Sequence, residues 1–517
     1  MGSGSQACPS IVSRILEIAA AAPGREALAW PGGRLDYGRL AAKVRSAAAL
    51  LAERGVRAGE RVVLAAPSRG PEFALGYLAC HWLGAVAVPV EPRLGSSTLR
   101  AILERTRPRL ALLEGAAPSG VESAALGELS RADGGGPDPS LAGPDEPADI
   151  LFTGGTTGAP KGVVQTARGI WAFARARNAA VGAGADDRLA LPLPLSHGYG
   201  LGRLRATLLA GGALILIDGF RAAGEVLRAL DELGATSLCC VPAGFAVLFQ
   251  TGGDELGAFD GLLSYVESAT APLTDAQKRR LMSLLPRARL FNSYGMTETT
   301  SSIAFIDLNR EAGKLGSVGR PVPGVELRIV DAQGRETPRG TAGRVLVRGD
   351  GVMKGYWGDE ALTREAFVDG WYASNDVGLI DGDGYLFLKG RVADLINVGG
   401  LKVAPPEVEE ALRAHPAVAD CACVAMPDPR GLSGEAVKAF LVLRPERRER
   451  PGAEELVEFL RGKLEDYKLP AEFAWVESIP RTPLGKISRA ALAAPAARDA
   501  DESAVIALLE RVRRTDS

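Results

Sequence analysis

Short apolar runs alternate with longer amphipathic stretches through most of the chain. An apolar run of strand length, bounded by Gly, Pro or charged residues, is typical of a strand buried on both faces of a parallel sheet. Such runs occur at 61–66, 85–90, 110–113, 148–152, 188–192, 213–217, 237–241, 262–267 and 289–292. Helical patterns lie between several of them, at 71–83, 99–105, 224–233 and 275–285. This alternation predicts an α/β fold built from parallel βαβ units.

Two stretches depart from this alternation. Residues 114–147 have little apolar periodicity, which predicts a surface connection. After residue 319, apolar and polar positions alternate at 325–330 and 344–347, as they do in half-exposed strands. This second stretch predicts a β-rich subdomain over about 319–390.

Beyond residue 391 the sequence predicts a compact α+β unit. A helix is expected at 405–413, where prolines and a glutamate occupy the first turn, and a second helix carries Leu456, Leu460 and Leu464 on one face. Strands are expected at 418–425, 439–443 and 473–476. We therefore expect an N-terminal domain over 1–390, a C-terminal domain over 391–495 and a helical or frayed tail over 496–517.

Composition and charge exclude several classes of protein. The chain has 517 residues, too many for one hydrophobic core, and a formal net charge of −2, which gives no electrostatic footprint for nucleic acid. No apolar run is long enough to span a membrane, and the N-terminus lacks the pattern of a signal peptide. Six cysteines without an export signal predict reduced thiols in the cytoplasm, and three scattered histidines favour core packing over a metal site.

The stretch 151–162, Leu-Phe-Thr-Gly-Gly-Thr-Thr-Gly-Ala-Pro-Lys-Gly, predicts a loop that binds phosphate. Glycines let backbone N–H groups approach an anion closely, and the hydroxyls and the ammonium add further donors. The stretch is not a Walker A motif, because that spacing fails at Ala159 and Gly162. For a Gly-rich stretch taken alone, a flexible surface loop is the alternative interpretation.

Four further stretches combine the residue types of ligand-binding loops. Residues 292–299 join an aromatic ring, a glycine, hydroxyls and one carboxylate, and 371–378 is predicted to place Asp376 in a tight turn. Residues 390–405 carry a basic side chain and a Gly-Gly pair, and 481–488 carries Lys486 on a Pro/Gly turn. Taken singly, the basic residues of these stretches are explained as well by structural or solvated roles.

Taken together, the five motifs resemble, in order and spacing, those of the adenylate-forming (acyl-CoA synthetase) superfamily, which includes luciferases and peptide-synthetase adenylation domains. The resemblance implies an α/β fold with a large N-terminal domain of mixed βα sheets, a β-rich subdomain and a small mobile α+β C-terminal lid. It implies a ligase reaction in two steps. A carboxylate attacks the α-phosphate of Mg²⁺-bound ATP and releases pyrophosphate, and a thiol then takes the acyl group and releases AMP.

The resemblance also implies a role for each motif of the N-terminal domain. The Gly/Thr loop, residues 153–158 of the stretch described above, and Lys161 would bind the β- and γ-phosphates. There, hydrogen-bond donors and a cation offset the charge of the leaving group. Tyr294 would lie near adenine, Thr297 would bind the α-phosphate, and Glu298 would bind Mg²⁺, a hard cation that prefers oxygen ligands.

Asp376 and Arg391 would bind the ribose, and Lys486 would bridge the substrate carboxylate and the α-phosphate. The expected catalytic residues are Lys486, His197 and Thr297. The expected nucleotide-binding residues are Thr153, Gly154, Gly155, Thr156, Thr157, Gly158, Lys161, Asn292, Ser293, Tyr294, Gly295, Met296, Thr297, Glu298, Asp376, Arg391 and Lys486.

The chain departs from the family pattern at three places. Ser374-Asn375-Asp376 stands where many relatives have Thr-Gly-Asp, and Asn tolerates a left-handed backbone. The hinge position two residues after Arg391 is Ala393 rather than Asp or Lys, so the lid is expected to pivot at Ala393 or at Asp394. The stretch that contacts adenine in relatives is altered to Ser-Ala-Thr-Ala-Pro at 268–272.

The segment 191–201, which carries an aspartate in peptide-synthetase relatives, has no carboxylate here. A buried ammonium without a partner costs several kcal/mol, so an α-amino acid is disfavoured and an aliphatic or aromatic acid is expected. His197 resembles the residue that acyl- and aryl-CoA ligases place beside the substrate carboxylate. The expected acid-binding residues are His197, Tyr199, Phe245, Ala269 and Gly295.

The thiol acceptor is predicted from the Gly-Gly pair. Gly399 and Gly400, with Lys402, resemble the border of the pantetheine tunnel in CoA ligases. CoA is therefore the expected acceptor, and loading of an acyl carrier protein is the alternative, because both present the same phosphopantetheine arm. A luciferase-like oxidative enzyme is a further alternative of a different class.

Overall fold

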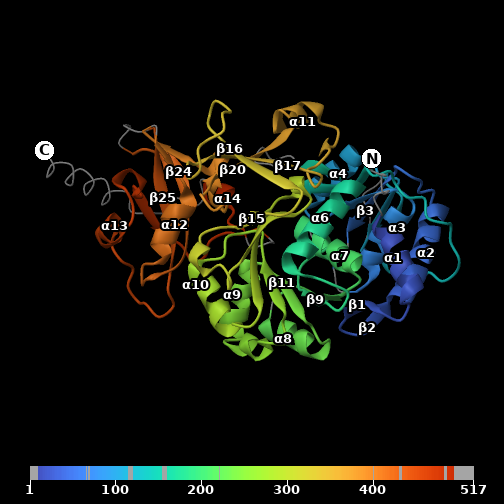
Figure 1. Cartoon of the computed structure of the whole chain (residues 1–517). Coiled ribbons are helices and arrows are strands. Elements are labelled where there is room, and N and C mark those ends of the chain that lie inside the picture. Colours follow the sequence, from blue (N-terminus) through green and yellow to red (C-terminus); the bar gives the residue numbers. More distant parts are fainter. Residues whose placement is uncertain are drawn as a thin grey trace. The chain divides into compact units, whose positions relative to one another are not determined.

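The computed structural model describes residues 10–65, 67, 70–92, 94–114, 120–153, 160–220, 222–399, 401–429, 434–482 and 486–493 (Figure 1). By contacts within the chain, it divides into two compact units. The first comprises Met1–Leu327 and Leu346–Ala373, and the second comprises Arg328–Val345 and Ser374–Ser517. The predicted domain boundary at residue 391 stays a prediction, and the predicted tail lies outside the described residues.

A nine-stranded sheet lies in the first unit, in the order β15-β14-β13-β12-β11-β9-β10-β1-β2. Its strands are β1 (Glu26–Trp30), β2 (Gly33–Asp36), β9 (Arg188–Leu191), β10 (Ala213–Leu216), β11 (Ser237–Cys240), β12 (Tyr265–Ser268), β13 (Arg289–Gly295), β14 (Ser302–Asp307) and β15 (Arg320–Pro321). Neighbouring strands from β13 to β1 are parallel, as the apolar runs predict. The strand predicted at 262–267 begins later, because Gly261 turns with a φ of +85° and Leu262 is exposed.

A seven-stranded sheet in the same unit has the order β18-β8-β7-β4-β3-β5-β6. Its strands are β3 (Arg61–Ala65), β4 (Val86–Pro89), β5 (Leu110–Leu113), β6 (Ser123–Ala125), β7 (Pro147–Thr153), β8 (Lys161–Thr166) and β18 (Gly355–Tyr356). The strand β7 pairs antiparallel with β8, with Thr153 opposite Lys161, so the Gly/Thr loop joins two strands of a hairpin. Most described residues of the surface connection predicted at 114–147 are exposed or half-exposed, but the connection also contains two short elements that the sequence did not indicate, β6 and α5 (Gly127–Arg131).

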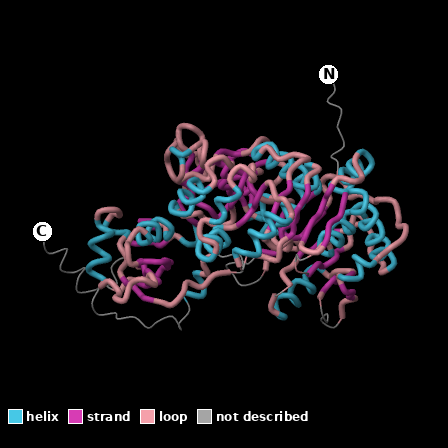
Figure 2. Tube along the Cα trace, turned by 90° about the horizontal axis from the view of Figure 1, so that it is seen from below, coloured by secondary structure: helices cyan, strands magenta, loops and turns pink. Residues whose placement is uncertain are grey.

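Helices cover both sheets of the first unit (Figures 1 and 2). They are α1 (Ile11–Ala21), α2 (Tyr37–Glu53), α3 (Glu72–Trp82), α4 (Ser96–Thr106), α6 (Ala167–Val181), α7 (Gly198–Ala210), α8 (Ala223–Glu232), α9 (Pro242–Thr251) and α10 (Asp275–Leu284). Residues all around α7 are buried, which is typical of a core helix. Its side chains reach β12 of one sheet and β7 of the other, so α7 lies between the two sheets.

The β-rich stretch forms a further sheet, β16-β17-β20-β19, with β21 paired to β20. Its elements are β16 (Val325–Val330), β17 (Gly343–Gly349), β19 (Phe367–Val368), β20 (Trp371–Ile380) and β21 (Leu386–Arg391), and α11 (Glu360–Ala366) precedes β19. The strands predicted at 325–330 and 344–347 are therefore confirmed.

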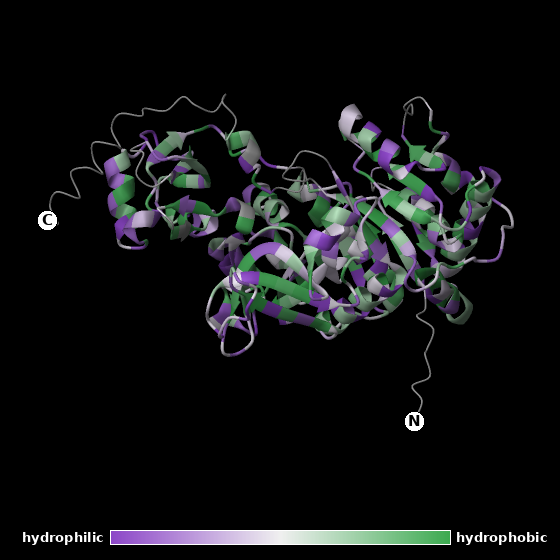
Figure 3. Cartoon of the chain, turned by 90° about the horizontal axis from the view of Figure 1, so that it is seen from above, coloured by the Kyte–Doolittle hydropathy of each residue, from purple (hydrophilic) through white to green (hydrophobic). Residues whose placement is uncertain are grey.

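The α+β prediction beyond residue 391 is confirmed by two small sheets and their helices. These elements are β22 (Ile396–Val398), β23 (Leu401–Val403), α12 (Pro405–Arg413), β24 (Val418–Pro427), β25 (Glu435–Leu443), α13 (Ala453–Arg461), β26 (Glu472–Trp475) and α14 (Arg489–Ala493). Val408 and Leu412 of α12 share a core with Leu456 and Leu460 of α13. Leu464, which was expected on the same helix, packs in this core but lies beyond the end of α13 at Arg461. Figure 3 shows many hydrophobic residues on the strands. No described helix has the length and apolar character needed to cross a membrane.

Candidate nucleotide and acid site

A tight turn after β13 carries two of the expected nucleotide-binding residues, Thr297 and Glu298. The strand ends at Gly295, where a Cβ atom would meet the Ser301 carbonyl oxygen at 1.9 Å, so only glycine fits. A single 3₁₀ turn, Thr297–Thr299, follows, and Thr300 then takes a φ of +65°. A left-handed non-glycine residue costs about 1–3 kcal/mol and persists only where its surroundings fix it.

Two neighbouring segments, β8 and residues 351–353, fix this turn. The Gln165 side chain on β8 donates from Nε2 to the Thr297 carbonyl oxygen at 2.9 Å. The Met353 N–H donates to the Glu298 carbonyl oxygen at 2.8 Å. The Thr300 hydroxyl donates to the Gly351 carbonyl oxygen at 2.6 Å. The backbone beside the Glu298 carboxylate is therefore set from several sides.

Tyr356 of β18 links the Glu298 carboxylate to Lys161. Its hydroxyl donates to Glu298 Oε1 at 3.2 Å, and Lys161 Nζ lies 5.8 Å from the centre of its ring. Burial, together with the charge of Glu298, raises the pKa of Tyr356, so its hydroxyl keeps the proton that it donates. No motif in the sequence pointed to Tyr356, because its contact follows from the pairing of β18 with β8.

The carboxylate of Glu298 fits a magnesium ion that a nucleotide helps to hold. Within the described residues there is no group of three or more His, Cys, Asp and Glu side chains that could hold a metal. Mg²⁺ differs from metals bound in all-protein cages, because it is often held by one or two carboxylates together with substrate phosphates. A single carboxylate, that of Glu298 on a fixed turn, suits this way of holding Mg²⁺.

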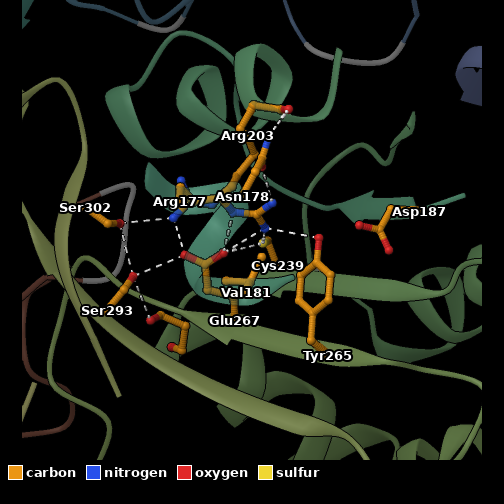
Figure 4. Close-up of polar contacts among 12 residues, drawn as sticks. Arg177, Asn178, Val181, Asp187, Arg203, Cys239, Tyr265, Glu267, Ser293 and Ser302 are labelled. Atoms are coloured by element: carbon orange, nitrogen blue, oxygen red, sulfur yellow. Dashed lines mark hydrogen bonds and ion pairs between the residues drawn. The ribbon is translucent and has the colours of Figure 1, made fainter. Parts of the chain in front are cut away.

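Beneath β13 lies the Glu267 cluster, which comprises Arg177, Arg203, Glu267, Ser293 and Ser302 (Figure 4). Its two arginines and Glu267 are fully buried. The Glu267 carboxylate accepts from Arg177 Nη2 at 2.9 Å, from the Ser293 hydroxyl at 3.2 Å and from Arg203 Nη2. The Ser293 side chain thus points into this cluster.

Burial favours the neutral form of Glu267, but Arg203 and Arg177 outweigh it and hold the pKa of the carboxyl below its ordinary value. The cluster therefore stays charged at neutral pH. Asn292 and Tyr294, the neighbours of Ser293 on β13, are also buried.

His197 directly precedes α7 and lies close to a carboxylate that the sequence did not indicate. Its Nε2 atom lies 3.3 Å from Glu91 Oε2, and the Ser196 hydroxyl donates to the same oxygen at 3.2 Å. Glu91 follows β4, far from His197 in the sequence, so no local spacing relates the two. The segment 191–201 itself holds no carboxylate, as its sequence states.

The other expected acid-binding side chains are buried and mostly apolar. Phe245, at the start of α9, and Ala269, which follows β12, belong to the core, and the Tyr199 ring stacks 4.3 Å from the Arg203 guanidinium. The altered stretch 268–272 contains Thr270 with a φ of +77°. Among the described residues, no hydrogen-bond partner reaches the buried Thr270 hydroxyl.

The second unit places Asp376 beside Arg391, which was expected to share its ligand. Arg391 Nε lies 3.2 Å from Asp376 Oδ1 across the pairing of β20 with β21. The prediction of a tight turn at Asp376 is wrong, because β20 continues through this position and Asn375 has no positive φ. Ser374 replaces the turn, since its buried hydroxyl accepts from the Asp376 N–H at 3.1 Å and donates to the Val345 carbonyl oxygen at 2.8 Å.

The remaining expected residues lie on short segments of the second unit. Lys486 is exposed, and its backbone N–H donates to the Thr482 hydroxyl at 3.2 Å. The expected hinge falls in a 3₁₀ turn, Val392–Asp394. Gly399 has a φ of +59° in the connection between β22 and β23, which supplies a structural reason for glycine there.

Several expected residues cannot be compared with the structure. Gly154, Gly155, Thr156, Thr157, Gly158 and Gly400 lie outside the described residues. The same holds for the side chains of Ala393 and Lys402, whose backbones are described.

Two family models match the chain. The AMP-binding enzyme model matches residues 16–357, and the AMP-binding enzyme C-terminal domain model matches residues 407–486. A fatty acid–[acyl-carrier-protein] ligase, ScoC of Streptomyces coeruleorubidus, is 32% identical over 90% of this chain and 92% of its own. A feruloyl-CoA synthase of an Amycolatopsis species is 32% identical over 88% and 93%.

Solved structures agree with these matches. ATP-bound MatB from Rhodopseudomonas palustris has a TM-score of 0.86 at 27% identity and covers 94% of this chain and 98% of its own. The o-succinylbenzoate CoA synthetase MenE from Bacillus subtilis, in complex with its acyl-adenylate OSB-AMP, has a TM-score of 0.84 at 27% identity, with the same coverage.

Proposed function

This chain belongs to the AMP-binding enzyme family, and on that premise we propose that it is an AMP-forming acid–thiol ligase. It activates a carboxylic acid with ATP to acyl-AMP and pyrophosphate, and then transfers the acyl group to a phosphopantetheine thiol. The observation that carries this proposal is similarity along nearly the whole chain to ligases that join different acids to thiols. The names of these relatives give different acids, but each names a ligase or synthase that acts with CoA or an acyl carrier protein.

In the first step, the acid carboxylate attacks the α-phosphate of ATP and the bond to pyrophosphate breaks. Lys161 and the Gly/Thr loop are proposed to bind the leaving phosphates, and Thr297 the α-phosphate. Glu298 would hold Mg²⁺, which when bound offsets negative charge on the phosphates. The hydrogen bond from Tyr356 supports this role, because it fixes one oxygen of the Glu298 carboxylate.

The second unit contributes the ribose and lysine functions of the proposal. Asp376 accepts from the ribose hydroxyls and Arg391 binds the same sugar, a task for which the observed pair is already assembled. Lys486 stabilises the charge that builds between the substrate carboxylate and the α-phosphate. Rotation of the C-terminal domain about Ala393 or Asp394 would then replace Lys486 by the acceptor thiol.

The substrate acid is proposed to be aliphatic or aromatic rather than an α-amino acid. Phe245 and Tyr199 supply a buried, largely apolar wall, and His197 supplies a polar group for the carboxylate. The Glu91 carboxylate already accepts from the Ser196 hydroxyl, and His197 Nε2 lies 3.3 Å from the same oxygen, so this carboxylate is not set aside for a substrate ammonium.

CoA is the proposed acceptor, with its pantetheine passing Gly399, Gly400 and Lys402. Transfer to an acyl carrier protein is the second candidate, which the similarity to an acyl-carrier-protein ligase favours. We place the reaction in the cytoplasm, where the buried free thiols of the described cysteines stay reduced.

A pyrophosphate-release screen tests the proposal. Purified protein is incubated with ATP, Mg²⁺ and one acid at a time from a panel of fatty, aromatic and amino acids. Acyl-AMP is sought by mass spectrometry, and thioester is sought with CoA, with a phosphopantetheinylated carrier protein and with neither. Adenylation of amino acids alone, or of no acid in the panel, contradicts the proposal. Thioester on the carrier protein but not on CoA selects the second candidate.

A further inference from the structure

The helix α7 carries two buried arginines that face opposite sheets. Arg203 and Arg205 are two positions apart, which places them about 200° apart around a helix. Arg203 reaches Glu267 on β12, whereas Arg205 reaches Asp149 on β7. Both guanidinium groups are fully buried, so neither can rotate away without losing its partner in a region from which water is excluded.

Arg205 is the centre of a second buried group, the Arg205 network, which comprises Tyr77, Asp149, Gln165 and Arg205. Arg205 donates from Nη2 to Asp149, from Nε to the Tyr77 hydroxyl at 2.8 Å and from Nη1 to Gln165 Oε1 at 2.9 Å. Tyr77 in turn donates to Asp149 at 3.1 Å. Each guanidinium nitrogen of Arg205 therefore has an acceptor, and the position of the group is fixed.

The charge of this network is also fixed. Burial favours a neutral Asp149, but the Arg205 guanidinium and His81 outweigh it and hold the pKa of the Asp149 carboxyl below its ordinary value. The ion pair thus persists at neutral pH.

Arg205 decides which way the Gln165 amide faces. A guanidinium only donates hydrogen bonds, so the amide oxygen of Gln165 must face Arg205 and its NH₂ group must face away. That NH₂ group donates to the Thr297 carbonyl oxygen at 2.9 Å. The orientation of the amide on β8 therefore follows from the chemistry of its neighbour.

We propose that Gln165, oriented by Arg205, is a positioning residue that holds the Thr297–Thr300 turn in the geometry needed to act on the α-phosphate. This inference rests on the proposed function. The turn includes Thr300 with a φ of +65°, a conformation that persists only under restraint. Gln165 donates to the Thr297 carbonyl oxygen, the first of that turn, and accepts from Arg205. The position of the turn therefore depends on the position of α7, which carries Arg205.

The variant Gln165→Met tests the proposal, because it keeps an unbranched side chain of similar length and removes both hydrogen bonds. Adenylation is measured by pyrophosphate exchange with an acid that the parent protein uses. We expect kcat to fall by about tenfold to 100-fold, as for a small displacement of a reacting group, while the KM for the acid changes little. The KM for the acid is spared because Gln165 bonds to Thr297 and Arg205 and not to His197 or Tyr199, the proposed acid-binding side chains of this region.

Tyr77→Phe is the matched control. It also deprives buried Arg205 of one acceptor and also lowers the melting temperature, but it leaves the bond from Gln165 to Thr297 in place. We expect its kcat to equal that of the parent. Equal losses of kcat in both variants, or a folded Gln165→Met with parental kcat, overturn the proposal.

Gln165→Glu serves if the methionine variant does not fold. A carboxylate still accepts from Arg205 but cannot donate to the Thr297 carbonyl oxygen, so kcat should fall although the network is retained. Parental kcat in this variant would also overturn the proposal.

Calorimetry with AMP separates this inference from the proposed function. A parent protein that binds AMP but adenylates no acid refutes the ligase proposal alone. In that case AMP affinity decides the inference. About tenfold weaker binding by Gln165→Met, with parental binding by Tyr77→Phe, supports it, and parental binding by both variants refutes it.

Discussion

The two units hold their proposed functional residues in different ways. In the first unit, the backbone beneath the proposed nucleotide site rests on charged groups that are fully buried and mutually paired, as in the Glu267 cluster and the Arg205 network. In the second unit, the Arg391 side chain is 56% exposed, and Lys486 is exposed as well.

This difference separates two consequences of mutation. A buried charge left without its partner destabilises the whole fold, because its desolvation is no longer offset. An exposed charge contributes little to stability, so its removal should show only in the step that uses it. Changes to the Glu267 cluster or the Arg205 network should therefore lower the melting temperature, whereas changes to Arg391 or Lys486 should alter rates in a folded protein.

The largest effect is expected from Glu267→Gln, which removes the negative charge between Arg177 and Arg203. Breaking a buried ion pair of this kind costs about 3–5 kcal/mol. The free energy of unfolding at pH 7 should fall by that amount in chemical denaturation. Because the pKa of Glu267 is lowered in the folded state, this contribution is present above its unfolded pKa and is lost as the pH falls through the folded pKa.

Glu326→Gln is the control for this comparison. Glu326 pairs with Arg348 at 2.6 Å, but both side chains are at least half exposed. The melting temperature of the Glu326→Gln variant should equal that of the parent. A loss of stability similar to that of Glu267→Gln would contradict the distinction between buried and exposed pairs.

Lys486→Ala should produce the next largest effect, in rate alone. Loss of one preorganised charge contact slows a step by on the order of 10²–10³. We expect adenylation to slow by this factor, while chemically supplied acyl-AMP is converted to thioester at nearly the parental rate. The melting temperature should not change. Equal loss in both half-reactions would mean that Lys486 has a structural role or that the C-terminal domain does not rotate.

The strands and helices were predictable because their periodicity is a local property of the sequence. The runs at 110–113 and 325–330 match β5 and β16 residue for residue, and the helix at 405–413 matches α12. The family motifs were predictable for the same reason, since each is a short contiguous stretch.

The supporting contacts of the site were not predictable, because they join residues that are distant in sequence. Glu91 meets His197, and Tyr356 meets Glu298, only through the pairing and packing of separate strands. The backbone conformation at Asp376, where a tight turn was expected, was mispredicted for a related reason. The hydroxyl of Ser374 bonds within an extended strand and performs the task that a turn was expected to perform.

A smaller effect is expected from Tyr356→Phe, which removes the donor to the Glu298 carboxylate. A hydrogen bond to a charged group is worth about 1.5 kcal/mol or more, which corresponds to about tenfold in binding. We expect the Mg²⁺ concentration for half-maximal adenylation to rise by about tenfold, because the Glu298 carboxylate loses a hydrogen-bond donor that orients one of its oxygens.

Tyr265→Phe makes the same chemical change beside the Glu267 cluster. Its hydroxyl accepts from Arg177 at 3.1 Å, so its loss should lower the melting temperature and leave the Mg²⁺ requirement unchanged. If the two variants shift the Mg²⁺ requirement equally, Tyr356 has no specific relation to Glu298.

The smallest effect is expected from Glu91→Gln, at the half-buried pair with His197. The pair is partly screened by solvent, and such pairs contribute about 1 kcal/mol or less. We expect the KM for the acid to rise by about threefold with kcat nearly unchanged, because the imidazole loses the carboxylate charge that lies beside it but not its place at the start of α7. Ser196→Ala separates the two contacts of Glu91, since it removes only the serine donor and leaves the distance of 3.3 Å from His197 to Glu91. Its KM should equal that of the parent. A Glu91→Gln enzyme with a parental KM and a reduced kcat would instead place Glu91 in the chemical step. The comparison between the units would then fail, because a partly exposed residue of the first unit would affect rate alone, as is expected of Lys486 in the second.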